Sequence, residues 1–229
     1  MTQNLTYQRQ CELYEYLCKF ITEKRRKRFE EVISLRTRHI TVILEDIYQS
    51  HNASAVLRTC DCFGIQDVHI IENRNPYKIN PDIALGSTNW LSLHNYQEKE
   101  NNSFDCLQNL KNKGYSIVAT NPHKNDCLLE ELDITHKTAI MFGTEKDGLS
   151  EIAIQQADAY VKIPMCGFTE SFNISVSAAI TMYSINEKLR KSDILWQLTQ
   201  DEKIELLINW ATNTISEGEK VVKQFLNAS

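Results

Sequence analysis

The stretch that decides the fold is residues 161–179, VKIPMCGFTESFNISVSAA. It begins as a short apolar strand, continues through a loop rich in Ser, Thr and Asn, and enters a long helix predicted over residues 172–189. Ser171 or Asn173 would cap the first turn of that helix, because both side chains accept hydrogen bonds from free backbone N–H groups. A strand that leads through a loop into a helix is the repeating unit of an α/β fold.

The alternation of strands and helices extends outward from this stretch. Short strands are predicted over residues 39–44, 68–71, 90–96, 116–120, 138–143 and 160–163. Helices are predicted over residues 3–35, 52–63, 103–113 and, as one or two amphipathic helices, 201–227. The expected fold class is therefore α/β, with a mainly parallel sheet, helices on both faces, and helical N- and C-terminal extensions.

The composition indicates a globular protein with a large core. Of the 229 residues, 42% are hydrophobic and 24% are charged, which is ordinary for a globular domain. No apolar run could span a bilayer, and the N-terminus lacks the basic and apolar regions of a signal peptide. We therefore expect a cytoplasmic location and no membrane partner. The seven cysteines include no Cys-x-x-Cys pair, so we expect no metal site.

Positive charge is concentrated near the N-terminus of an acidic chain. The net charge is −5, but residues 1–40 contain nine Lys and Arg against five Asp and Glu. The basic run within them is Lys24, Arg25, Arg26, Lys27 and Arg28. This run indicates either an RNA-binding arm or the solvated face of a helix, and both interpretations stay open.

Two further segments have patterns typical of ligand sites. Residues 52–64, NASAVLRTCDCFG, predict a helix capped by Asn52, in which Arg58 lies alone among small and apolar residues and needs water, a carboxylate or a phosphate. Residues 139–150, AIMFGTEKDGLS, lead from a buried strand into a polar loop. Such loops bind ligands in open α/β sheets, although an ordinary turn has the same pattern. The glycine signatures of a dinucleotide site and of a P-loop are both absent.

Together the three segments resemble the three motifs of the SpoU/TrmH family of RNA 2′-O-methyltransferases, in the family's order. The matching patterns are NxxAxxR followed by CDxxG, then FGxExxGLS, then IPMxGxxxSxNxS, and the resemblance covers residues 39–190. It implies that the C-terminal part of the sheet forms a deep trefoil knot, which holds S-adenosylmethionine in place of a glycine-rich loop. It also implies a homodimer and a reaction that needs no metal.

The resemblance implies a catalytic site centred on Arg58, which would grip the substrate phosphate and stabilise the developing alkoxide. The other catalytic positions would be Asn52, Glu145, Ser171 and Asn173, which orient Arg58 and the ribose. The positions that line the methyl donor would be Thr120, Gly143, Ile163 and Phe172. Phe172 replaces the family's more common Leu, a change that would alter packing but not chemistry.

The domain organisation favours a tRNA substrate. We expect a basic helical arm over residues 1–38, the knotted domain over 39–190 and a helical extension over 191–229. The short arm leaves no room for the separate RNA-binding domain common in ribosomal relatives. The family's tRNA guanosine-18 methyltransferases also have a short basic N-terminal helix and a helical C-terminal tail, so the resemblance implies that the substrate is the D-loop guanosine at position 18 of tRNA. Ribosomal RNA is the alternative within the family, and a non-catalytic knotted RNA-binding protein is the alternative outside it.

A dimer interface is expected on the long helix after Ser171 and on the C-terminal helices. Its expected residues are Ala178, Ala179, Ile204, Leu207, Ile208 and Trp210. The apolar residues among them need more cover than a single domain readily provides.

Overall fold

The computed structural model describes residues 5–121 and 127–227, which belong to two compact units. Thr37–Trp196 form an α/β domain, and Met1–Arg36 with Gln197–Ser229 form a helical unit. The two ends of the chain therefore pack with each other, which the sequence pattern does not indicate. The expected division into arm, knotted domain and extension stays a prediction.

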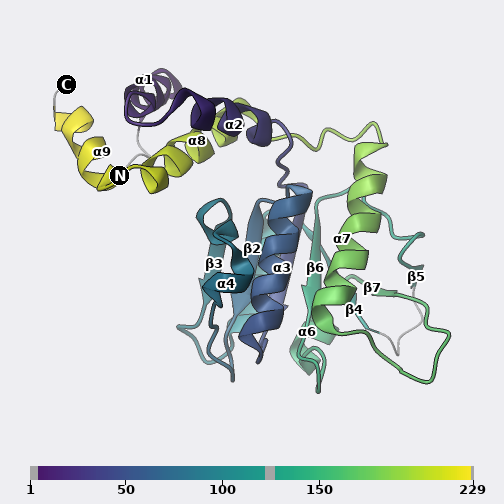
Figure 1. Ribbon diagram of the computed structural model, residues 1–229. Helices are drawn as coiled ribbons and strands as arrows, with labels where there is room; N and C mark the ends of the chain where they lie inside the picture. The colour runs from purple at the N-terminus through teal and green to yellow at the C-terminus, as the bar shows by residue number, and fades with distance from the viewer. Residues whose placement is uncertain (1–4, 122–126, 228–229) are drawn as a thin grey trace. The chain divides into compact units, whose positions relative to one another are not determined.

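Among the described residues, the α/β domain contains a sheet of seven parallel strands in the order β3-β2-β1-β6-β4-β7-β5 (Figure 1). The strands are β1 (Ile40–Glu45), β2 (Asp67–Ile71), β3 (Ser92–Tyr96), β4 (Ser116–Thr120), β5 (Cys127–Leu128), β6 (Thr138–Phe142) and β7 (Ala159–Lys162). The predicted α/β class with a parallel sheet is confirmed. The strand that the prediction missed, β5, has two residues and is too short for a recognisable period.

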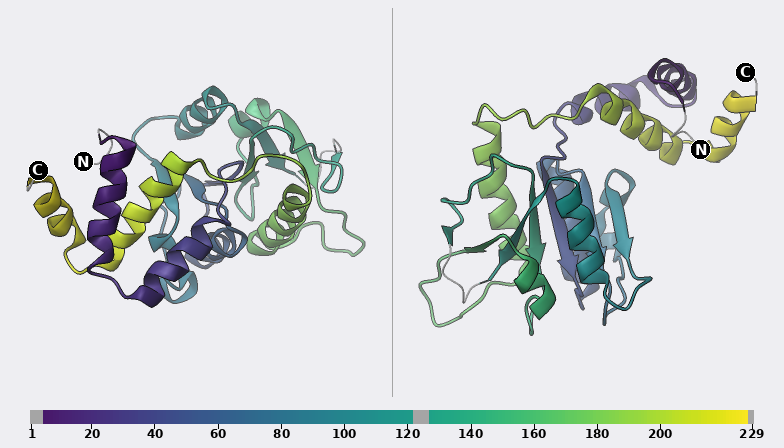
Figure 2. Two further views of the ribbon diagram at one scale, coloured as in Figure 1. Left: turned by 90° about the horizontal axis from the view of Figure 1, so that it is seen from above. Right: turned by 180° about the vertical axis from the view of Figure 1, so that it is seen from behind.

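Helices cover both faces of this sheet (Figures 1 and 2). In the described residues, the helices of the α/β domain are α3 (Ser50–Phe63), α4 (Pro81–Ala84), α5 (Asn102–Asn112), α6 (Glu151–Gln156) and α7 (Ile174–Arg190), with a 3₁₀ turn at Ser87–Asn89. α3 and α7 pack together over the face that contains Val42 and Leu44, whereas α5 and α6 cover the face that contains Ile43. Successive residues of β1 thus enter the two cores in turn, because strand side chains alternate between faces.

The helix ends follow the predicted signals with one exception. Gly64, at φ 75°, ends α3, and Asn173 caps α7 by accepting a hydrogen bond from the backbone N–H of Ser175. Asn52, however, is not the N-cap of α3, contrary to the sequence prediction. The helix begins at Ser50 with Gln49 as its N-cap, because the Asn52 side chain is bonded to other segments.

The helical unit contains α1 (Tyr7–Cys18), α2 (Glu23–Ile33), α8 (Gln200–Thr214) and α9 (Gly218–Asn227) in its described part. The prediction of helix throughout residues 3–35 misses a break before Thr22, which caps α2. Phe20 falls in that break and is half exposed. No helix in the described ranges is long and apolar enough to cross a membrane.

The apolar residues of α8 are covered within the chain. Ile204, Ile208 and Trp210 are 2–6% exposed, and Leu207 is partly buried. α1 and α2 pack against α8, with the rings of Phe29 and Trp210 5.7 Å apart. Ala178 is likewise buried, in the α/β core. The expectation that a second subunit is needed to cover these four buried residues is therefore wrong, whereas Leu207 and Ala179 are only partly buried.

Candidate active site

The three motif segments meet at the carboxyl edge of the sheet. β1 and β6 are neighbours in which Leu44 pairs with Phe142, so the loops that follow them leave from the same edge. The first loop leads into α3, the second contains residues 143–150, and residues 163–173 connect β7 to α7. This is the edge at which open parallel α/β sheets bind their ligands.

Asn52 joins the three segments. Its side-chain Nδ2 donates hydrogen bonds to Oε1 of Glu145 and, at 3.2 Å, to Oε1 of Gln49. Its Oδ1 accepts a hydrogen bond from Nδ2 of Asn173 at 3.2 Å. Asn52 is buried, and these bonds satisfy most of the polar capacity of its amide. One residue from each of the three motifs thus belongs to a single network, which we call the Asn52 network: Asn52, Glu145 and Asn173.

Asn173 is oriented for this contact by its role at the start of α7. Its Oδ1 accepts hydrogen bonds from the backbone N–H of Ser175 at 2.9 Å and from the Ser175 hydroxyl at 2.6 Å. With the oxygen used in the cap, the amide nitrogen is left to bond Asn52. Ser171, two residues earlier, lines the neighbouring pocket.

A buried carboxylate that the sequence analysis missed holds the loop after β6. Glu45, at the end of β1, is 1% exposed. It accepts hydrogen bonds from the backbone N–H of Ser150 at 2.8 Å, from the Ser150 hydroxyl at 2.7 Å and from the Ser103 hydroxyl. These donors offset the cost of burying a charge. Its one sequence signal is an acidic residue directly after an apolar strand.

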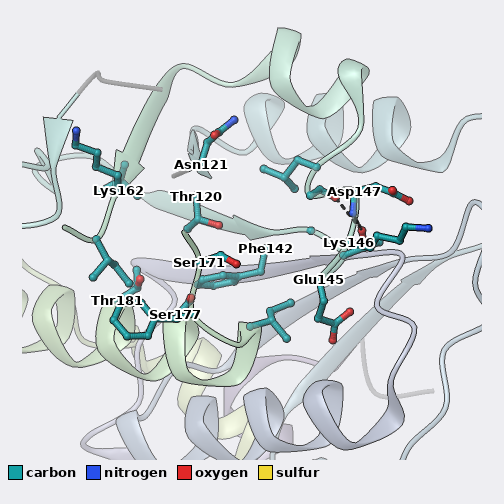
Figure 3. A pocket seen from close by; sticks show the side chains of 18 of the residues that line it. Thr120, Asn121, Phe142, Glu145, Lys146, Asp147, Lys162, Ser171, Ser177 and Thr181 are labelled. Carbon is teal, nitrogen blue, oxygen red and sulfur yellow. Dashed lines mark hydrogen bonds between the residues drawn. The ribbon is translucent and has the colours of Figure 1, made fainter. Parts of the chain in front are cut away.

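A pocket of about 250 Å³ lies beside the Asn52 network, between the loops after β4, β6 and β7 and the start of α7 (Figure 3). Its walls include six predicted site residues: Thr120, Gly143, Glu145, Ile163, Ser171 and Phe172. Figure 3 shows Thr120, Phe142 and Ser171 near its centre, whereas the amino group of Lys146 points away. The structure thus brings these six positions together, and their individual roles stay predictions.

The wall of this pocket has no room for a side chain at Gly143. A Cβ there would lie 2.3 Å from the backbone of Gly148 and 2.4 Å from the nitrogen of Leu149. The approach is close because the backbones of Thr144 and Gly148 bond to each other in both directions, at 2.9 and 3.1 Å. Gly148 itself has a φ of 70°, which favours glycine.

The lining of the pocket fits S-adenosylmethionine, which has an apolar ring, a positive sulfonium and polar ends. Leu149, Ile154 and Val161 provide apolar walls, and Glu145 and Asp147 contribute carboxylates, which would favour a positive centre. The volume is just below the roughly 300–1,000 Å³ of common ligand pockets. In the described residues no group of His, Cys, Asp and Glu is placed to hold a metal ion.

Arg58 lies apart from both the pocket and the Asn52 network. It is six residues beyond Asn52 on α3, about 9 Å further along the helix and roughly 120° around it. Its side chain is exposed and forms no hydrogen bond or ion pair within the described part of the chain. The structure leaves this guanidinium available to an anion but does not bring it to the other predicted catalytic residues.

The basic run lies in α2, and part of its charge is already paired. Its members are Lys24, Arg25, Arg26, Lys27 and Arg28. Arg26 bonds both carboxylate oxygens of Glu15, at 2.6 and 3.0 Å, and one oxygen of Glu30 at 3.1 Å. The hydrogen bonds that Arg26 donates to Glu15 and, to a lesser extent, to Glu30 raise the pKa of Arg26. Lys27 and Arg28 each face a glutamate of the same helix, at 3.9 and 3.2 Å.

The α/β domain matches a known protein family. Residues 39–183, which contain all three motif segments, match the family model described as the SpoU rRNA Methylase family. The chain is also 48% identical over 212 residues to a tRNA (guanosine(18)-2'-O)-methyltransferase of Borreliella burgdorferi. That alignment covers 93% of this chain and 95% of the relative.

Solved structures share the fold. The crystal structure of the TrmH/SpoU tRNA modifying enzyme of A. aeolicus matches with a TM-score of 0.75 and 31% identity, over 85% of this chain and 98% of that one. The SpoU methyltransferase AviRb of Streptomyces viridochromogenes, solved in complex with AdoMet, matches with a TM-score of 0.56. Its 19% identity, over 71% of this chain and 62% of that one, supports likeness of fold alone.

Proposed function

Because this chain belongs to the SpoU rRNA Methylase family, we propose that it transfers a methyl group from S-adenosylmethionine to a ribose 2′-hydroxyl of RNA. The substrate that we propose is guanosine 18 in the D-loop of tRNA, the nucleotide in the name of the Borreliella relative. The observation that supports this reaction is the Asn52 network, in which residues of three separate motifs are bonded beside one pocket.

Bound S-adenosylmethionine would supply an electrophilic methyl group for the 2′-oxygen. This chain would contribute mainly positioning, which is worth about 7–11 kcal/mol in well-oriented reactions. We assign to Arg58 the substrate phosphate, because its guanidinium lies apart from the pocket in which the alkoxide would form. Its permanent protonation makes it a poor general base.

The Asn52 network would orient the ribose. Asn52 fixes one carboxylate oxygen of Glu145, and the exposed Glu145 side chain lines the pocket, where it can accept a hydrogen bond from a ribose hydroxyl. Ser171 offers a hydroxyl from the start of α7. The phosphate of a nucleotide lies several ångströms from its 2′-hydroxyl. Arg58 could therefore bind the phosphate while the ribose lies at the Asn52 network.

The deep trefoil knot is also part of the proposal. β7 pairs with β4 on the side away from β6. Asn173 nevertheless bonds Asn52, at the start of the helix that follows β1. Residues 163–173 must therefore pass across the carboxyl ends of β4 and β6 to reach α3. This path crosses the loops that follow those two strands, which supports a knot. A folded domain fused to the C-terminus would have to be threaded through a loop each time that the knot forms. If the chain is knotted, the fusion should therefore refold more slowly than the protein without the fused domain.

We also propose a homodimer that uses the outer face of α7. Phe172, Val176 and Tyr183 are 42%, 44% and 58% exposed, and at helical spacing Val176 and Tyr183 lie on one face, with Phe172 just before the first turn. Exposed apolar residues on one face favour a protein interface. Sedimentation should give about twice 26.5 kDa, and Tyr183→Asp should weaken association. A wild-type protein that sediments only as a monomer at micromolar concentration would contradict this interface.

We also propose a cytoplasmic location, where tRNA is available as a substrate. Among RNA substrates we propose tRNA in preference to ribosomal RNA. Ribosomal RNA stays the second candidate because the matched family model is named for it. A non-catalytic RNA-binding protein is disfavoured because the three motif residues of the Asn52 network are all present and bonded.

The test is a methylation map. Purified protein and S-adenosylmethionine are incubated with a tRNA transcript and with ribosomal RNA, and 2′-O-methyl groups are located at nucleotide resolution. We expect one methyl group on guanosine 18 of tRNA and none when that nucleotide is replaced by 2′-deoxyguanosine. Methylation of ribosomal RNA alone would overturn the substrate, and no methylation of either RNA, with no binding of S-adenosylmethionine, would overturn the enzyme.

A further inference from the structure

Tyr48 is an exposed aromatic side chain on a firmly held loop. The loop after β1 has Ile47 buried in the core, whereas Tyr48 is 76% exposed. Gln49 fixes the other side: its carbonyl accepts the backbone N–H of Asn52 at 3.0 Å, and its side chain accepts a hydrogen bond from Asn52 Nδ2. The ring therefore reaches solvent from a backbone that is anchored before and after it.

Asp46 ties this loop to the loop after β2. Its Oδ1 accepts hydrogen bonds from the backbone N–H groups of Asn73 at 2.7 Å, Arg74 at 2.8 Å and Asn75 at 3.3 Å. The Asn75 side chain returns a bond to the Asp46 carbonyl at 2.9 Å. Asp46 has a φ of 53°, an uncommon value for a residue other than glycine that persists only where contacts enforce it.

The loop after β2 contains two exposed cations, Arg74 and Lys78. Neither has an ion pair or hydrogen bond from its side chain within the described residues. Within this loop and α4, which follows it, the acidic residues are Glu72, whose Oε2 accepts the backbone N–H of Tyr77 at 2.8 Å, and Asp82. Glu98 and Glu100 lie in the loop after β3, the strand next to β2. The whole range Thr37–Trp196 has 14 Lys and Arg against 20 Asp and Glu, so unpaired cations are unexpected at this edge.

Both loops leave the edge of the sheet at which the Asn52 network lies, because β1 is paired with β2 on one side and β6 on the other. Tyr48 and Asn52 are four positions apart, so their Cα atoms are separated by at most about 14 Å, a distance that one nucleotide can bridge. RNA-binding proteins hold splayed bases by aromatic stacking and hold phosphates by Arg and Lys.

We propose that these two loops form a docking surface for the target nucleotide, in which Tyr48 stacks on its base and Arg74 and Lys78 bind adjacent phosphates. The inference rests on the proposed function and adds where the RNA lies. Stacking tolerates any base, so this surface would hold the nucleotide without selecting guanine. Asp46 acts as the clamp that keeps the aromatic ring and the two cations on one surface.

The ring is tested by a double-mutant cycle with full-length protein and tRNA transcripts that have either guanosine or an abasic ribose at position 18. Tyr48→Ala should raise the KM for the intact transcript about 5- to 150-fold, the range for loss of one stacked base. The affinity for S-adenosylmethionine should be unchanged, and Tyr48→Phe should stay within about two-fold of wild type. With the abasic transcript, wild type and Tyr48→Ala should bind equally. An equal effect of Tyr48→Ala on both transcripts would overturn the stacking.

The cations are tested by salt dependence. Arg74→Ala with Lys78→Ala should reduce the slope of log affinity for tRNA against log salt by about 1.4–1.8, for two phosphate contacts. The matched control is Lys113→Ala with Lys137→Ala, which removes two exposed cations near the amino ends of β4 and β6 and should leave the slope unchanged. Equal slopes in both double variants would overturn the surface.

The outcomes separate this inference from the proposed function. If the wild-type protein methylates tRNA and all these variants behave like it, the docking surface is wrong and the proposed function stands. If the wild-type protein methylates no RNA, the proposed function fails and the docking surface fails with it.

Discussion

The basic run of α2 and the cations at the carboxyl edge of the sheet differ in a way that the sequence alone does not show. In α2 five cations are consecutive, yet Arg26 is bonded to two glutamates and its two successors face glutamates of the same helix. Arg74 and Lys78 lie in the loop that leaves this edge of the sheet, and Arg58 lies about 9 Å along α3 from Asn52, all in an acidic domain. All three are exposed, and none has a side-chain partner among the described residues.

The cause is the position of the carboxylates. The glutamates of α2 lie three or four residues from the cations, one helical turn away, where opposite charges meet. At the sheet edge the carboxylates of Glu45 and Asp46 are turned toward backbone N–H groups and hydroxyls and hold the loops in place. The density of positive charge along a sequence is therefore a poor measure of the charge that an anion can reach.

The strongest test of this comparison is Arg58→Ala. Loss of this phosphate contact should misplace the 2′-hydroxyl and lower kcat by about 10²-fold. The Kd of S-adenosylmethionine should not change, because Arg58 does not line the pocket. Arg58→Lys is the matched control and should recover little activity, since Lys restores the charge but not the planar fork. Activity near that of wild type in Arg58→Ala would remove this residue from the mechanism.

Much of the fold could be predicted because it follows from local periodicity. The apolar runs that became β1, β2, β4, β6 and β7 were found to within about two residues, and Gly64 marked the end of α3. The features that were missed depend on few residues or on distant ones. β5 has two residues, and the association of the terminal helices joins segments that lie at opposite ends of the sequence.

The candidate site divides in the same way. The resemblance to a family predicted that Thr120, Gly143, Ile163 and Phe172 share one pocket, which the periodicity of the sequence could not predict. Single-residue reasoning failed at Asn52, because its partners are 93 and 121 residues away and a local cap was the simplest explanation. Glu45 and Asp46 were missed for the same reason: a carboxylate that clamps distant backbone groups has no local pattern.

A second test concerns a group that is both buried and ionisable, His69 in β2. It is 3% exposed, and its ring stacks on His94 with centroids 4.6 Å apart. Burial and then the charge of His94 lower the pKa of His69 to about 3, although Asp67 opposes this. Below about pH 6.5 the unfolded chain binds a proton at this site that the folded chain does not. The free energy of unfolding should therefore decrease as the pH is lowered, by about 2 kcal/mol between pH 6.5 and pH 5.

This prediction is checked by urea unfolding at pH 7 and pH 5. His69→Gln, which cannot titrate, should lose about 2 kcal/mol less stability than wild type over that range, whatever its stability at pH 7. The control is His136→Gln, at an exposed turn before β6, which should keep the wild-type loss. The same acid loss in His69→Gln as in wild type would show that His69 does not couple folding to protons.

The smallest effects are expected in α2, where single cations can be replaced and the salt dependence of tRNA binding measured for each. Replacing all five cations of the basic run with Ala should weaken tRNA binding and flatten its salt dependence, without changing the affinity for S-adenosylmethionine. Each phosphate contact contributes roughly 0.7–0.9 to the slope. Arg26 should contribute none, because its bonds to Glu15 and Glu30 would have to break first.

The decisive pair is therefore the five-residue variant and a four-residue variant that retains Arg26. Equal slopes in the two, both flatter than wild type, mean that the exposed members of the run meet RNA while Arg26 serves the helix packing. A wild-type slope in both returns α2 to a solvated helix face. A slope that falls further when Arg26 is also removed means that RNA displaces Glu15 and Glu30. In that case the pairs seen in the free protein would not measure the charge available to RNA, and the difference between α2 and the sheet edge would disappear on binding.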